Sequence, residues 1–191
     1  AIGQIVYRFG QCGTPVVLTR CLRISKALRL DLASMSGETI RIILLVVLTG
    51  LLVAAAITDI RSRIISNRLN IAIALLAPLY WLASGLPVWP DMALQLALGI
   101  GMFGIFAMLF ALGMMGGGDV KLLAAVALWF PWQALMMLLI IMALLGGIVT
   151  LVTVIHHRAT KRLGQPEVPY GVAISLAAMW LVGERIVYQF T

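Results

Sequence analysis

The sequence predicts an all-α, polytopic membrane protein: a bundle of six transmembrane helices in which the fourth helix is short. Hydrophobic residues make up 62% of the 191 residues and charged residues only 11%, with a mean hydropathy of +1.07. Soluble domains are nearer to about 45–50% apolar and about 25% charged. Long apolar stretches also recur between short polar loops, and a bilayer core of about 30 Å needs about 20 helical residues to cross it.

The first three spans follow from apolar stretches with clear ends. The first covers residues 40–58 and is closed by Asp59. A short basic loop runs to Arg68, and the second span covers residues 69–84. The third covers residues 92–115 and carries small residues at four-residue spacing, which allow helices to pack closely in lipid.

The topology depends on a short apolar stretch, residues 120–130. A helix of this length covers about 16 Å, so it is either re-entrant or a short crossing that begins below the membrane surface. We expect a crossing, followed by spans over residues 132–155 and 170–187. The basic loop residues then share one side, which the positive-inside rule makes cytoplasmic: Arg61, Arg63, Arg68, Lys121, Arg158, Lys161 and Arg162.

A polar, basic segment over residues 1–38 precedes the membrane domain over residues 39–191. The six-span topology places this segment outside the cytoplasm, against the positive-inside rule, so we expect it to be disordered or not native to the chain. Met35 is then a candidate natural start. The alternative is an amphipathic helix over residues 16–32 on the membrane surface.

The net charge of +7 does not predict nucleic-acid binding in a chain this apolar. Basic residues at membrane borders set topology and contact anionic lipid, so the lipid bilayer is the expected partner and nucleic acid is not. His156 and His157 are adjacent, but no acidic or thiol ligands are near them in sequence. We therefore expect no metal and no cofactor.

Two aspartates are the candidate functional residues. Asp119 follows three glycines between two apolar segments, and Asp59 ends the first span. A charged side chain at membrane depth costs a few kcal/mol, so such a residue is a functional-site candidate by default. Two crossings separate these two helix ends, so both aspartates are predicted on the cytoplasmic side at similar depth.

Paired carboxylates in a low-dielectric site favour sharing one proton. The ionised one can take a proton from water and the protonated one can donate to a scissile carbonyl, which hydrolyses a peptide bond without a metal. Three alternatives stay open. The aspartates are only helix-end and capping residues, they serve a small proton-coupled transporter, or they belong to a non-catalytic assembly protein.

Seven residues are candidate supporting residues: Gly116, Gly118, Lys121, Asn67, Pro169, Tyr170 and Gly171. The first two glycines permit a turn or the close approach of a substrate. Lys121 either interacts with a carboxylate or lipid phosphate or is a border lysine. Asn67 either bonds the loop carrying Asp59 or, the preferred interpretation, caps the second span. The last three residues shape the site or only start a helix.

Three motifs carry a resemblance to a known family. Gly116-Gly-Gly-Asp119 fits the GxGD pattern of intramembrane aspartyl proteases, and with the following Val-Lys-Leu-Leu it resembles the second-aspartate motif of prepilin peptidases. Asp59-Ile-Arg-Ser-Arg-Ile-Ile-Ser-Asn67 resembles their first motif, with Ser66 where the family has proline. Val168-Pro-Tyr-Gly171 resembles their Pro-Phe/Tyr-Gly segment. The resemblance covers roughly residues 38–190.

This resemblance implies that Asp59 and Asp119 are the catalytic pair of an aspartyl endopeptidase. Its substrates would be prepilin and pseudopilin precursors, cut between a short basic leader and an apolar helix at the cytoplasmic border of a bacterial or archaeal plasma (inner) membrane. The size of the chain resembles the short, Tad/Flp-type members. Longer members carry two Cys-x-x-Cys pairs and also N-methylate the new terminus; the sequence contains neither pair, so we do not expect methylation.

Overall fold

A computed structural model describes the backbone of residues 15–159 and 170–190. The chain divides into two compact units, Ala1–Thr39 and Ile40–Thr191. Helix α2 (Pro15–Ser62) begins well before the expected first span and ends three residues after Asp59. The separate nature of the basic segment over residues 1–38 stays a prediction.

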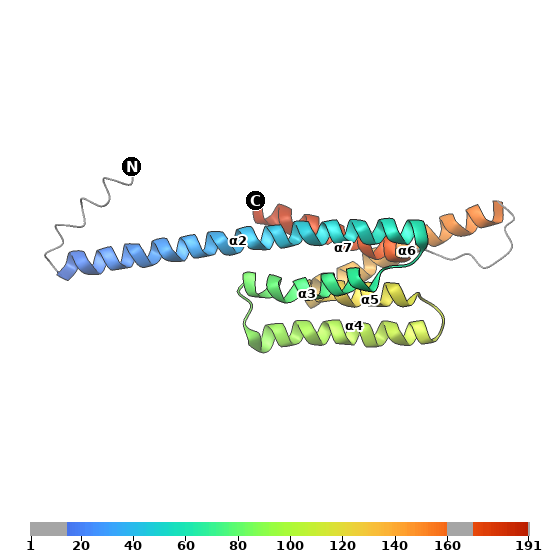
Figure 1. The fold of residues 1–191 in the computed structure, drawn as a ribbon, viewed down its shortest axis with the longest axis horizontal. Helices are drawn as coiled ribbons and strands as arrows, with labels where there is room; N and C mark the ends of the chain where they lie inside the picture. Colours follow the sequence, from blue (N-terminus) through green and yellow to red (C-terminus); the bar gives the residue numbers. More distant parts are fainter. Residues whose placement is uncertain (1–14, 160–169, 191) are drawn as a thin grey trace. The chain divides into compact units, whose positions relative to one another are not determined.

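Helices make up the second unit, and the part of the chain that the structure describes contains no strand, which confirms the all-α prediction (Figure 1). The elements after α2 follow one another along the chain with short connections: α3 (Asn67–Ala83), the irregular segment η2 (Val88–Met92), α4 (Ala93–Ala111), α5 (Gly117–Ala127), α6 (Trp132–Ala159) and α7 (Tyr170–Phe190).

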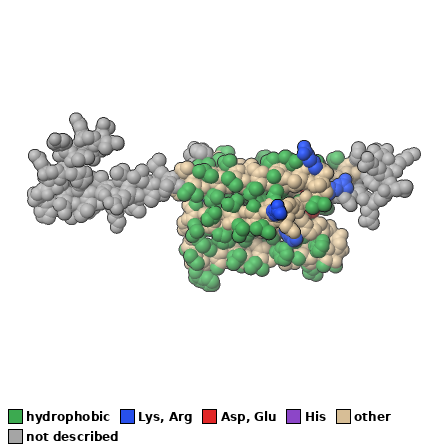
Figure 2. Space-filling model, in the orientation of Figure 1, with side chains coloured by type: hydrophobic (Ala, Val, Ile, Leu, Met, Phe, Trp, Pro, Cys, Tyr) green, Lys and Arg blue, Asp and Glu red, His purple; other side chains and the backbone are tan. Residues whose placement is uncertain are grey.

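Four segments of the described chain are long and apolar enough to cross a membrane: Gly37–Ser62, Val88–Ala111, Trp132–Thr153 and Tyr170–Val187. They establish a polytopic membrane protein. Helices α3 and α5, with 17 and 11 residues, are shorter than these four. That α3 and α5 also cross the membrane, as the six-span topology requires, therefore remains a prediction. The outer surface agrees with a lipid environment, because hydrophobic side chains cover much of the face shown in Figure 2.

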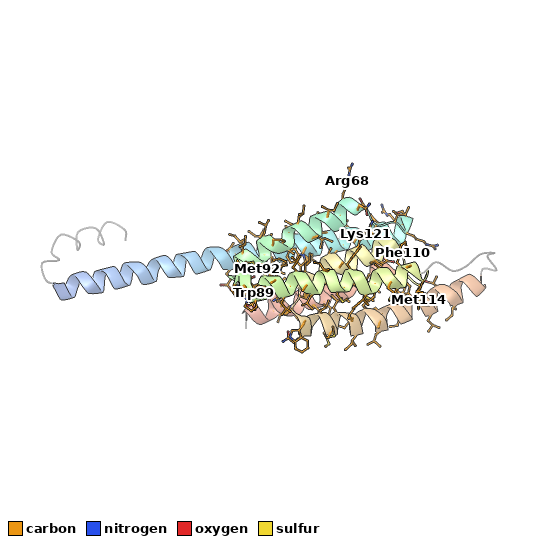
Figure 3. The ribbon with its side chains drawn as sticks, turned by 90° about the horizontal axis from the view of Figure 1, so that it is seen from below. Arg68, Trp89, Met92, Phe110, Met114 and Lys121 are labelled. Carbon is orange, nitrogen blue, oxygen red and sulfur yellow. The ribbon has the colours of Figure 1, made fainter. Side chains whose placement is uncertain are left out.

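Basic side chains gather toward one end of this unit (Figure 2). In Figure 3, Arg68 and Lys121 lie toward the end that holds Phe110 and Met114, near the end of α4. Trp89 and Met92, in η2 just before α4, lie at the opposite end. We call the end with Arg68 and Lys121 the basic end.

Helix α5 lies at the centre of the unit and packs against α3, α4 and α7. Most of its side chains are buried, including Val120, Leu122 and Leu123, so the helix presents hardly any face outward. A helix buried in this way needs neither the length nor the exposed polar stripe of an outer helix. Its start at Gly117, three residues earlier than expected, places Asp119 inside the first helical turn.

The other end of α5 is held by side chains from three helices. The last carbonyl groups of a helix have no partner within it, and leaving them unpaired in an apolar interior is costly. The Leu128 carbonyl accepts hydrogen bonds from Trp81 at 2.8 Å and from Gln95 at 3.1 Å. The Phe130 carbonyl accepts a second bond from Gln95 at 2.6 Å, and the Trp129 carbonyl accepts one from Arg185 at 3.1 Å. These bonds fix how deeply α5 sits in the bundle.

Candidate functional site

Asp59 lies in the last turns of α2 and is 4% exposed. Its Oδ2 accepts a hydrogen bond from the backbone N–H of Val172 at 3.0 Å. Because α7 begins at Tyr170, this N–H is one of the first donors of α7, which have no partner within the helix. The carboxylate of Asp59 thus accepts a hydrogen bond that the Val172 N–H cannot form within the first turn of α7.

Asp119 lies in the first turn of α5 and is 8% exposed. The interpretation of Asp119 as the helix cap is wrong, because Gly116 occupies the N-cap position. A Cβ on Gly116 would lie 2.8 Å from Oδ2 of Asp119. The glycine therefore leaves room for the carboxylate beside the turn.

Gly171 shows that the two carboxylates lie together. A Cβ added to this residue would lie 2.8 Å from Oδ2 of Asp59 and 3.0 Å from Oδ1 of Asp119. Oδ2 of Asp59 and Oδ1 of Asp119 therefore border the same small space, and the distance between these two oxygens is at most the sum of the two distances. Helices α2, α5 and α7 meet at this point, and only a residue without a side chain fits there.

A cavity of about 370 Å³ opens beside the pair. Both aspartates line it, together with residues 63–67 of the loop after α2, the three glycines before Asp119, and Lys121. A water molecule occupies about 30 Å³ of liquid, so this cavity has room for several waters or a peptide segment. We call it the aspartate cavity.

Lys121 and Asn67 join α5 to the start of α3. The amine of Lys121 donates to Oδ1 of Asn67 at 3.0 Å. The expectation that Asn67 caps the second span is wrong, because the cap is Ser66, whose hydroxyl accepts from the N–H of Arg68 at 3.3 Å. Both residues can cap a helix, and sequence alone did not distinguish them.

Two buried residues at the site were missed. Asn70 donates through Nδ2 to the carbonyl of Gly118 at 3.3 Å, which supports the glycine turn from α3. Ile65 lies between Gly118 and Gly171, with its Cβ 3.4 Å from where a Cβ on Gly118 would stand. A polar residue inside an apolar span was an available signal for Asn70, whereas nothing in the sequence pattern singled out Ile65.

Of the two residues before Gly171, the structure describes only Tyr170. Pro169 lies outside the described residues. The ring of Tyr170 lies against α6, 3.3 Å from where a Cβ on Gly146 would stand, and Tyr170 does not line the aspartate cavity. Among the described residues, no group of three or more His, Cys, Asp or Glu side chains is placed to hold a metal ion.

Comparison with known proteins gives a family match. The sequence model of the type IV leader peptidase family matches residues 46–151, which include both aspartates. Two curated proteins from Aeromonas salmonicida, one of them from strain A449, are 28% identical to the chain over 140 residues, and both carry the name prepilin leader peptidase/N-methyltransferase. The match covers 70% of this chain and 46% of each relative, so the chain spans about half the length of these relatives. No solved structure matches the chain.

Proposed function

The chain belongs to the type IV leader peptidase family, and we propose that it is a membrane-embedded aspartyl endopeptidase that removes the leader from prepilin and pseudopilin precursors. The observation that carries this proposal is the position of the two carboxylates. Asp59 and Asp119 border the same space beside Gly171, and both line one cavity.

The chemistry needs one proton on the pair. Two carboxylates this close in an apolar setting cannot both be charged cheaply, so one is ionised and the other keeps its proton. The ionised carboxylate takes a proton from a water molecule in the aspartate cavity, and that water attacks the scissile carbonyl carbon. The protonated carboxyl group donates to the carbonyl oxygen, which gives a tetrahedral diol. The carboxyl group that took the proton from water then passes it to the leaving nitrogen, a diol hydroxyl returns a proton to the other carboxylate, and the C–N bond breaks to give the new carboxyl and amino termini.

The basic end gives the proposed orientation. Arg68 and Lys121 lie at this end, and Lys121 also lines the aspartate cavity. By the positive-inside rule this end faces the cytoplasm, so cleavage takes place at the cytoplasmic border of the membrane. Flp-type prepilins are the substrates to test first, because the sequence resembles the short Tad/Flp-type members.

The experiment is cleavage of a co-expressed Flp-type prepilin, followed by gel shift and N-terminal sequencing of the product. We compare the wild-type protein with Asp59→Asn and Asp119→Asn, which keep the size of each side chain and remove the acid. Asp91→Asn is the matched control, because Asp91 is exposed and follows Trp89 and Pro90, far from the basic end.

Loss of processing in both site variants, with the control active and membrane levels equal, is the expected result. Processing that survives in both would show that these aspartates are not the catalytic pair. A precursor left uncut by the wild-type protein would count against the peptidase, and a proton-flux assay in liposomes would then test the proton-coupled transporter.

A further inference from the structure

An apolar groove of about 560 Å³ lies next to the site, between α3, α4 and α5. Helix α5 packs against both neighbours and forms its floor. One wall comes from α4 through Leu96, Ile100 and Phe103, and the other from α3 through Ile71 and Ala74. These spacings of three, four and seven residues place each set along one helix face. We call this cavity the apolar groove.

The floor of the apolar groove is made of small side chains. Ala124 and Ala125 of α5 line it, with Gly99 of α4 beside them and Leu128 further along. Small residues let the backbone of another helix come close, and in lipid such close packing is what drives helices together. The lining is almost entirely apolar, and it extends over about two helical turns, or roughly 10 Å.

The apolar groove and the aspartate cavity share two lining residues, Asn67 and Lys121. The hydrogen bond between these side chains therefore stands where the two cavities adjoin. The groove is polar only at this end, where Asn67, Asn70 and Lys121 line it. A chain that enters the aspartate cavity can thus continue directly into an apolar path.

We propose that the apolar groove binds the apolar segment of the polypeptide being cut, as an α-helix, while the scissile bond lies in the aspartate cavity. This inference rests on the proposed peptidase function. A chain beside the bilayer core has to satisfy its backbone groups internally, so the bound segment is helical. The large wall residues are exposed in the free protein, with Ile71 57% and Ile100 63% exposed, and a bound helix would cover them.

The kinetic test places a bulky side chain in the groove. Ile100→Trp places an indole ring in the apolar groove. Ile105→Trp is the matched control on the same helix, since Ile105 is 61% exposed and does not line the groove. Two substrates are compared: a precursor that carries its apolar segment, and a short peptide that ends a few residues after the scissile bond.

For Ile100→Trp we expect KM for the full precursor to rise about tenfold, as for loss of one buried apolar contact. The short peptide should be cut at the wild-type rate, and Ile105→Trp should match the wild type on both substrates. Equal precursor kinetics in the two variants would overturn the groove proposal and leave the proposed function intact. A wild-type protein that cuts neither substrate would overturn the proposed function, and this inference with it.

Photocrosslinking gives a second measurement that does not depend on turnover. A benzoylphenylalanine at position 100 or at position 105 is placed in the Asp119→Asn variant and irradiated with the precursor in membranes. We expect crosslinks to the apolar segment of the precursor from position 100 and none from position 105. Crosslinks from position 100 to lipid alone would overturn the proposal.

Discussion

The Val172 N–H and the Asp59 carboxylate form a 3.0 Å hydrogen bond between residues that are 113 positions apart in the sequence. This bond ties the end of α2 to the start of α7. Gly171, the neighbour of Val172, brings the same helix start against Asp119 as well. The first turn of α7 is therefore the element on which both aspartates converge.

Gly171→Ala should abolish most of the peptidase activity. Its methyl group would stand within 3.0 Å of both carboxylate oxygens and 2.6 Å from Cδ1 of Ile65, so at least one of these groups must move. A displacement of about 1 Å at a catalytic site costs about 100-fold in rate, and we expect kcat/KM for precursor cleavage to fall by at least that factor. Gly183→Ala is the control on the same helix, because nothing lies within 4 Å of its added Cβ. Equal rates for the two variants would show that the carboxylates do not need this space.

The rate of cleavage should depend on pH as a bell-shaped curve. At low pH both carboxyl groups are protonated and the base is lost; at high pH both are ionised and the acid is lost. The measurement is kcat/KM in proteoliposomes across the range in which carboxyl groups titrate, with Asp91→Asn expected to keep the wild-type curve. A rate that stays constant through this range would contradict a mechanism in which Asp59 and Asp119 share a proton.

Asn70→Leu should lower both stability and activity. The substitution keeps the number of side-chain heavy atoms but removes the hydrogen bond to the carbonyl of Gly118, which becomes an unpaired acceptor in the interior. We expect the free energy of unfolding to fall by about 0.5–1.5 kcal/mol, with slower cleavage because the turn before Asp119 loosens. Thermal unfolding in detergent and precursor cleavage measure the two effects. Asn67→Leu is the comparison, and an equal loss of stability there, at an exposed position, would contradict the role assigned to Asn70.

Gln95→Leu should destabilise the protein through the far end of α5. The amide of Gln95 donates to the carbonyls of both Leu128 and Phe130. Leu128 keeps its hydrogen bond from Trp81, so the substitution leaves the Phe130 carbonyl unpaired, which costs about 1–3 kcal/mol. The same detergent unfolding experiment checks this, with Gln133→Leu as the control because Gln133 is exposed. A Gln95→Leu variant as stable as the control would show that water or other groups take over these carbonyls.

The sequence was sufficient to single out Asp59 and Asp119 as candidates and to predict most of the helices. Charged residues at the ends of apolar stretches are costly and therefore conspicuous, which is how Asp59 and Asp119 were found. Apolar length predicted the segments that became α4, α6 and α7. Helix ends were less well predicted. The start of α5 at Gly117 was missed because the glycines in its first turn carry no helical pattern.

The contacts that build the site could not be read from local pattern. Asn70 and Gly118 are 48 positions apart, and the fit of Ile65 against Gly118 and Gly171 depends on how three segments meet in space. The cap before α3 shows the same limit on a smaller scale. Ser66 and Asn67 are adjacent and chemically equivalent as caps, and only the backbone path decides between them.

The contribution of α7 also sets an order of events during biosynthesis. The ribosome makes α2 and α5, with both aspartates, before it makes the turn at Tyr170–Val172. Until that turn enters the membrane, Asp59 lacks its hydrogen-bond donor and the two carboxylates have no common boundary. Under the proposed function, a nascent chain that already contains both aspartates is still an incomplete enzyme until the start of α7 is in place.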